Sequence, residues 1–471
     1  MYGKKFNKGL VVIVIMSCLL VAGCTRGAGH HSEEIKVTLK VLYPNEEAFF
    51  RQYGDLFRMS HANIDFEVIR TPNLNSNGRD RTYEEALDEL VKTEQPDILI
   101  LDTATFKNYI SEGKLLELDS LIQKDHYPLE GIYPGLIDLL KELGGNKLYG
   151  LAPTFYGTAL FYNKGLFSKY GIEQPHDGMT WQEVLDLARR FPTDGDEGSR
   201  VYGFGNDYPI TVMNYPMSVG NLVDLIANTE GLMSVNPNIL KLTVDTDSWK
   251  KVYRLAIEAE KSGVIYNPKD AGFTGGSIEE YYRSQAFLMG RVAMIIGDPY
   301  TSQNAKLARD ILKDDKPINM GIVSGPVNSS DPETTLTASV DEIFAIHGNS
   351  TNKDAAWEFL KFVNGEDYAR VKSKSMNGTL LSRMGFNEEY GGQSLDVFYA
   401  LKPKINPDHM NSDKIPDAFY VQLQSIVSGE LSQVQEGKKS LDEAAKMIQD
   451  EGQVALDQVL KDQQADRGTS N

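Results

Sequence analysis

The sequence predicts an α/β protein whose first half forms a parallel, doubly wound sheet. Two segments, 36–44 and 64–70, alternate apolar and polar residues as strands do, and 97–102 is a short apolar run typical of a buried strand. Helical patterns fill the intervals at 46–59 and 82–92. This alternation indicates a parallel sheet, with ligands expected at the carboxyl ends of its strands.

Later helices are predicted from capping residues, apolar stripes and glycine stops. Residues 180–183 read Thr-Trp-Gln-Glu, a capping box that begins a helix. Trp181, Trp249 and Trp357 each fall on or beside an apolar helical stripe, so we interpret all three as core residues. Gly263 and the pair at 364–365 are predicted helix stops.

The N-terminus has the pattern of a secretory signal. Lysines 4, 5 and 8 precede an apolar run at 9–20, which is too short to span a bilayer and ends at Val21-Ala22-Gly23-Cys24. Those four residues resemble the lipobox of bacterial lipoproteins. The resemblance implies that 1–23 is a removed signal peptide, that Cys24 carries a lipid anchor of the palmitate type, and that 24–35 is a flexible tether. The alternative is an ordinary signal peptide followed by a chance cysteine.

Composition excludes several classes of function. The 471-residue chain has a net charge of −18, which argues against nucleic acid as a partner. Both of its cysteines lie in the first 24 residues, so the body contains none. No motif of a nucleophile elbow, zinc protease or P-loop occurs, and we expect neither an enzyme nor a bound metal or cofactor.

Four ordered segments resemble the extracellular solute-binding proteins of ABC importers, family 1, the maltodextrin-binding-like class. The first, 160–191, reads LFYNKGLFSKYGIEQPHDGMTWQEVLDLARRF, with a strand before Asn163 and a helix stop at Gly171. The others are FLMGRVAMIIGDPY at 287–300, MGIVSGPV at 320–327, and the strand and helices of 341–371. A tryptophan that the family usually carries after the second of these is replaced here by Gly297-Asp298-Pro299-Tyr300.

The resemblance implies a two-lobed periplasmic-binding-protein (Venus-flytrap) fold, with a hinge that the chain crosses more than once. We expect crossings near 151–157, 334–340 and 391–398. The first lobe then comprises 36–152 and 341–395, the second comprises 153–340 and 396–462, and 463–471 is a polar tail. The ligand binds in the cleft, where contacts with both lobes stabilise the closed form.

Candidate ligand-binding residues are those at strand ends and crossings that face the expected cleft. Rings can pack against sugar C–H groups, and carboxylates accept hydrogen bonds from sugar hydroxyls. The candidates are Tyr43, Asn45, Asp102, Thr103, Phe155, Tyr156, Asp298, Tyr300, Asp341 and Glu342.

The leading hypothesis is therefore a monomeric, membrane-tethered, extracytoplasmic receptor that delivers a sugar or oligosaccharide to the permease of an ABC transporter. A second hypothesis is a lipoprotein that senses a ligand and signals to a membrane receptor. A third, from a different class, is a surface glycosidase, which would need two carboxylates about 5–10 Å apart.

Overall fold

The three strands predicted in the first half form one edge of a five-stranded sheet. The computed structural model describes residues 36–71, 83–196, 200–206, 218–267, 275–313, 318–375, 378–386, 388–407, 410 and 414–468, with backbone only at 417, 464 and 466–468. The predicted signal peptide, Cys24 and the tether lie outside the described residues. Strands β1 (Val37–Tyr43), β2 (Ile64–Arg70) and β3 (Ile98–Leu101) occupy the predicted positions, and β1 runs parallel to both neighbours.

The first sheet is mixed rather than wholly parallel. Its order is β2-β1-β3-β13-β4, where β13 spans Ile343–Ile346 and β4 spans Gly150–Leu151. Strand β13 is antiparallel to both β3 and β4. Because β13 comes from the later part of the chain, its reversed direction has no signal in the alternating first half.

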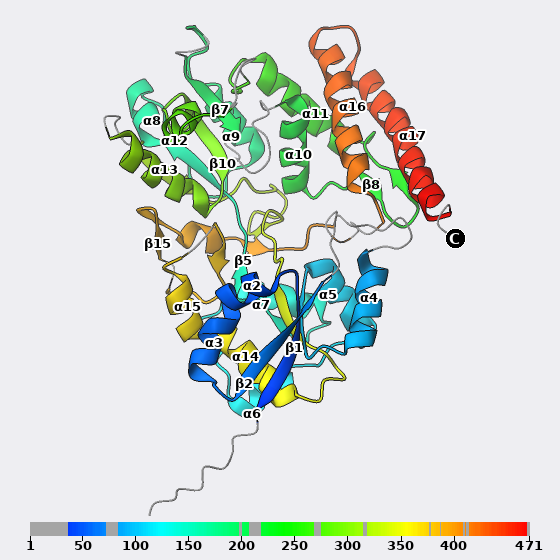
Figure 1. Cartoon of the computed structure of the whole chain (residues 1–471). Coiled ribbons are helices and arrows are strands. Elements are labelled where there is room, and N and C mark those ends of the chain that lie inside the picture. Colours follow the sequence, from blue (N-terminus) through cyan, green and yellow to red (C-terminus); the bar gives the residue numbers. More distant parts are fainter. Residues whose placement is uncertain are drawn as a thin grey trace, which may run out of the picture.

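Helices surround this sheet to make the first lobe, the lower one in Figure 1. The helix predicted at 46–59 is continuous but changes type along its length, with a π-helical turn in the middle. The helical segments are α2 (Glu46–Phe49), the π-helix η1 (Phe50–Gly54), α3 (Asp55–Ser60), α4 (Tyr83–Glu94), α5 (Thr103–Ser111), α6 (Asp119–Asp125), α7 (Pro134–Leu143), α14 (Lys353–Val363) and α15 (Glu366–Lys372).

A four-stranded sheet forms the second lobe. Its order is β11-β6-β10-β7, with bounds Met320–Val323, Ala159–Asn163, Val292–Gly297 and Tyr202–Asn206. Only β10 and β7 are parallel; β6 is antiparallel to both of its neighbours. The helices around this sheet are α8 (Lys164–Tyr170), α9 (Trp181–Ala188), α10 (Val219–Glu230), α11 (Asp247–Lys261), α12 (Ile278–Ser284), α13 (Pro299–Leu312), α16 (Asp417–Gln435) and α17 (Leu441–Gly468).

The sequence signals for helix starts, buried helix faces and helix ends are confirmed. Thr180 and Glu183 form the predicted capping box of α9. The three tryptophans are buried, with exposed fractions of 2%, 6% and 2% at Trp181, Trp249 and Trp357. Gly171 ends α8 in the left-handed conformation, which glycine adopts without strain.

Two clusters of buried apolar side chains hold the lobes together. One fills the first lobe and continues through Phe155 and Phe398 to the α12–α13 side of the second sheet. The other lies between the second sheet and α9, α10, α11 and α16. Helix α17 packs against α16, and its described length reaches Gly468, within the range predicted as a polar tail.

The chain passes between the two sheets at least three times over its described length. It leaves the first sheet after β4 and enters the second at β6; it returns between β11 and β13, and leaves again between α15 and α16. Short strands join these passages: β5 (Thr154–Phe155) pairs with β14 (Leu380–Leu381), and β12 (Thr334–Thr335) pairs with β17 (Lys402–Pro403). Figure 1 shows these segments between the two lobes.

Candidate functional site

Glu342 is bound by two tyrosines at the point where the chain re-enters the first lobe. The Tyr43 hydroxyl, at the end of β1, donates a 2.7 Å hydrogen bond to Glu342 Oε1. The Tyr53 hydroxyl, from the π-helical turn η1, donates to Glu342 Oε2. Burial, and then the negative charge of Glu342, raises the pKa of Tyr43, so its hydroxyl stays protonated as a donor. Two elements of the first lobe are thereby held at one carboxylate.

A lysine lies beside this group. Lys372 Nζ is 5.7 Å from the ring centroid of Tyr53 and 5.8 Å from that of Tyr368. Burial lowers the pKa of Lys372, although the negative charge of Glu342 acts in the opposite direction. The ammonium is thus packed against aromatic faces rather than held out in solvent.

Tyr156 joins the first two crossings and keeps an exposed ring. Its backbone exchanges two hydrogen bonds with Ser339, of 2.8 Å and 3.1 Å. Next to this bridge, Thr158 Oγ1 donates to Thr337 Oγ1 over 2.9 Å. Tyr156 is 41% exposed, whereas the preceding Phe155 is 2% exposed.

Carboxylates from both lobes lie around Tyr156. Burial raises the pKa of the Tyr156 hydroxyl, and the charges of Asp341, Glu342 and Asp298 raise it further, in that order. Asp341 and Glu342 directly precede the first-lobe strand β13, whereas Asp298 follows the second-lobe strand β10. We call Tyr43, Tyr156, Asp298, Asp341 and Glu342 the crossing site.

Two helices begin at this site with aspartate caps. Asp102 accepts hydrogen bonds of 2.9 Å from the backbone N–H and the hydroxyl of Thr105, at the start of α5. Thr103 Oγ1 donates to the Val340 carbonyl over 2.8 Å, which holds α5 next to Asp341. Asp298 accepts a 2.8 Å bond from the Tyr300 N–H at the start of α13, and burial raises its pKa.

The remaining predicted residues have different surroundings. Asn45 is exposed and caps α2 by accepting from the Ala48 N–H over 2.9 Å. Tyr300 is partly buried in the first turn of α13, directly after the cap residue Asp298 and Pro299. Glycine 378 lies against this turn, since a Cβ atom there would be 3.3 Å from Tyr300 Cβ and 3.8 Å from Asp298 Oδ2.

Phe155 has no ring face to offer a ligand in this conformation. Only 2% of it is exposed, and its ring centroid lies 5.3 Å from that of Tyr133 and 5.4 Å from that of Tyr399. We therefore correct its interpretation as a ligand-binding residue: it packs the hinge. Tyr53 and Lys372 were not predicted from the sequence, because each lies within a helical pattern and no motif or strand end singles it out.

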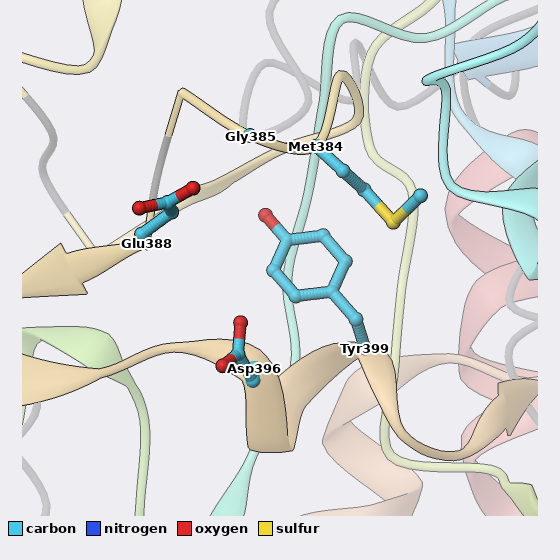
Figure 2. Close-up of a pocket in the computed structure, with 5 residues that line it drawn as sticks. All are labelled: Met384, Gly385, Glu388, Asp396 and Tyr399. Carbon is cyan, nitrogen blue, oxygen red and sulfur yellow. The ribbon is translucent and has the colours of Figure 1, made fainter.

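A separate cavity of about 190 Å³ lies on the last passage between the lobes. It is lined by Met384, Gly385, Glu388, Asp396 and Tyr399. Figure 2 shows both carboxylates on one side of the Tyr399 ring and Met384 on the other. The Tyr399 hydroxyl donates to the Leu381 carbonyl over 2.8 Å, so the ring forms a fixed wall. None of the residues predicted from sequence lines this cavity.

The described residues hold neither a candidate metal site nor a candidate membrane-spanning helix. No group of three or more His, Cys, Asp or Glu side chains there is arranged to hold a metal ion. Nor is any helix in those ranges long and apolar enough to cross a membrane.

Comparison with known proteins identifies the family. A family model described as "Bacterial extracellular solute-binding protein" matches residues 77–370, more than half of the chain. This chain belongs to that family. Membership places it outside the cytoplasm, among proteins that bind small solutes and work with transporter permeases.

Several known proteins are distantly similar to this chain. A binding protein of Brucella abortus is 23% identical over 412 residues, which cover 84% of this chain and 89% of the relative. The sn-glycerol-3-phosphate-binding periplasmic protein UgpB of Brucella melitensis is 21% identical over 375 residues, covering 75% and 80%. Among solved structures, the sugar-binding protein MalE of Xanthomonas citri matches with a TM-score of 0.61 at 15% identity, covering 90% of this chain and 98% of that one. At this identity the structural match supports the two-lobed fold alone.

Proposed function

We propose that this family member is the membrane-tethered receptor of an ABC importer, and that it captures a sugar or oligosaccharide between its lobes for delivery to the permease. The observation that carries the proposal is the exposed ring of Tyr156 at the crossings, with carboxylates of both lobes around it. A ring face and hydrogen-bond acceptors are what a hydroxyl-rich ligand needs. A ligand held there would contact both lobes and could therefore favour a closed form.

The lobe boundaries are part of this proposal. The first lobe comprises 36–152 and 341–395, and the second comprises 153–340 and 396–462, with the hinge at the crossings near 151–157, 334–340 and 391–398. The assignment of strands to the two sheets supports the first two crossings. At the third, the hairpin of β15 (Glu389–Tyr390) and β16 (Gln393–Ser394) contacts α13 of the second lobe, although its residues fall in the first-lobe range.

The ligand-binding set is also proposed, and it omits Phe155. We propose that Tyr156 and Tyr300 present ring faces, while Asp298, Asp341 and Glu342 accept hydrogen bonds, with Tyr43 holding Glu342 in place. Asn45, Asp102 and Thr103 border the same junction at the ends of β1 and β3. A lipid on Cys24, after removal of 1–23, would hold this body at the membrane through the tether 24–35.

A two-stage binding experiment tests the function. The melting temperature of the purified protein is first measured against a panel of mono- and oligosaccharides, because a ligand at one hundred times its Kd adds about 2.7 kcal/mol of stability. Any sugar that binds is then added in a small-angle scattering experiment, where we expect the radius of gyration to fall. If no sugar raises the melting temperature, the ligand class is wrong. If a tight ligand leaves the radius of gyration unchanged, capture between the lobes is wrong.

A further inference from the structure

A histidine is buried in the first lobe, at the end of β13 opposite Glu342. His347 directly follows this strand, and only 5% of it is exposed. Its Nδ1 atom is buried and has no hydrogen-bond partner among the described residues. An imidazolium carries an N–H group on both ring nitrogens, and each of them needs an acceptor when it is buried. The surroundings of His347 therefore suit the neutral ring and not the charged one.

The carboxylate of Asp97, which lies beside His347, is already occupied. Asp97 is 4% exposed, and its Oδ1 atom accepts a 2.6 Å hydrogen bond from the Ser350 hydroxyl. Its Oδ2 atom accepts a 2.9 Å bond from the Lys40 N–H, and the Asn352 amide donates to both oxygens over 3.3 Å. A protonated imidazole would have to displace one of these donors to reach the carboxylate.

Charged groups from three neighbouring elements act on the imidazole. Burial is the largest influence and lowers the pKa of His347, while the Pro96 carbonyl and then the charge of Asp97 raise it. The positive charges of Lys114 and Lys353 lower this pKa further. Asp97 precedes β3, Lys114 follows α5 and Lys353 begins α14. The net result is a pKa below the ordinary value, so the folded protein holds this ring neutral near pH 7.

The segment 347–352, which we call the clasp, is fastened to the first lobe by backbone hydrogen bonds. The N–H of His347 donates to the Asp97 carbonyl over 2.9 Å, and the N–H of Gly348 donates to the Lys114 carbonyl over 2.7 Å. The Ser350 N–H donates to the His347 carbonyl over 3.0 Å. The packing is tight, since a Cβ atom at 348 would lie 3.2 Å from the carbonyl oxygen of Lys114. Hydrating a charge on the enclosed ring therefore requires these bonds to open.

We propose that the clasp is an acid-sensitive latch: protonation of His347 opens segment 347–352 and loosens β13, whose other end leads to Glu342 in the crossing site. The four residues of β13 are each 0% exposed, so the strand cannot shift at one end without disturbing the core around it. This inference goes beyond the proposed function, because it concerns the fold and needs no ligand. The extracytoplasmic location of the family exposes the latch to the pH of the surroundings.

The pH range of the latch follows from the direction of the pKa shift. Above about pH 6.5 the ring is neutral in both the closed and the open clasp, so pH has no effect through this residue. Below that value the open clasp takes up a proton that the closed one does not, and the closed form loses stability until its own lower pKa is reached. At pH 5 this loss is at most about thirtyfold in the ratio of closed to open molecules, and we expect about tenfold.

Amide hydrogen exchange of the full chain, followed by mass spectrometry, is the measurement. Exchange is recorded at about pH 7.5 and about pH 5 and corrected for the intrinsic effect of pH on exchange. Peptides that cover 343–352 are compared with peptides that cover 292–297, strand β10 of the second lobe. We expect the protection of the first set to fall about tenfold in acid and that of the second to change much less. His347→Gln should abolish this fall, because glutamine cannot be charged, even if it lowers protection equally at both pH values.

An exposed histidine of the same lobe supplies the matched control. His126 is exposed and has a φ of +49°, a conformation that asparagine tolerates, so His126→Asn removes a titrating ring without straining the backbone. This variant should keep the fall in protection seen in the wild type. A fall that disappears in His126→Asn as well would contradict the assignment to His347.

Two results would overturn the latch. One is a wild type whose 343–352 peptides stay as protected at pH 5 as at pH 7.5, and the other is a folded His347→Gln variant that loses protection as the wild type does. If His347→Gln does not fold, His347→Asn takes its place, and if neither folds, the wild-type comparison of the two peptide sets decides. No ligand is added, so these results leave the proposed sugar ligand to its own test.

Discussion

At the scale of single residues, Phe155 and Tyr156 are neighbours with opposite surroundings. Successive side chains of an extended segment point to opposite sides, so the ring of Phe155 enters the hinge core while that of Tyr156 remains 41% exposed. We expect Phe155→Ala to lower the free energy of unfolding by about 3–5 kcal/mol. Tyr156→Ala should change it far less, but should weaken sugar binding by about 1–3 kcal/mol, a tenfold to hundredfold loss.

Thermal melting and calorimetric titration of the two alanine variants check this pair together. Each variant serves as the control for the other, because the two positions are adjacent in the chain and differ in burial. A large loss of stability with unchanged affinity in Tyr156→Ala would place that ring in the core and remove it from the proposed site.

The residues of the site differ in how far the sequence alone could predict them. Glu342 could be selected because it follows an expected crossing, and its hydrogen bond with Tyr43 joins two predicted candidates. Tyr53 could not be selected in this way, because its contact with Glu342 depends on the π-helical turn. No residue pattern predicts that turn. The burial of Phe155 could not be predicted, because a crossing segment exposes only one of its two faces.

At the scale of elements, segments with local signals were predictable and those that depend on distant partners were not. β2 and the capping box of α9 follow from patterns within a few residues. The antiparallel insertion of β13 depends on where the chain returns after a long excursion, and the contact of the local hairpin β15–β16 with α13 depends on where that hairpin docks. Such choices are made by tertiary contacts, which alternation within one segment does not encode.

The contact of that hairpin with α13 can be tested with two adjacent glycines. Gly391 and Gly392 have φ values of +63° and +86°, so alanine is strained at both by about 1–2 kcal/mol. A Cβ atom at 391 would also lie 2.3 Å from the carbonyl oxygen of Ser302 in α13, whereas one at 392 would have nothing within 4 Å. We expect Gly391→Ala to cost about 1–3 kcal/mol more than Gly392→Ala.

Urea unfolding of the two glycine variants gives the comparison. Equal losses of stability would mean that the hairpin does not rest on α13 in solution, and the proposed third crossing would then need to be redrawn. A larger loss at 391 would show that the last passage is held against the second lobe.

At the scale of the whole molecule, the fold and the location have different support. The two-lobed architecture follows from family membership and from the two sheets, but the periodicity of the chain alone predicted only one parallel sheet. The reason is that β6 and β10 are separated by more than one hundred residues, and their antiparallel pairing is visible only after folding. The proposed location at the membrane, in contrast, depends on a few residues at the N-terminus.

The proposed membrane anchor therefore depends on Cys24. With three lysines removed along with residues 1–23, the body becomes more negative than the full chain at −18, and an anionic membrane surface would repel it. A covalent lipid would then be what holds it there, since two acyl chains anchor stably where one does not. We expect Cys24→Ser to release the protein from the membrane fraction while its melting temperature stays unchanged, because the body begins beyond the tether. Mass spectrometry of the wild-type N-terminus is the direct measurement, and an unmodified chain cut at any other bond would contradict the anchor.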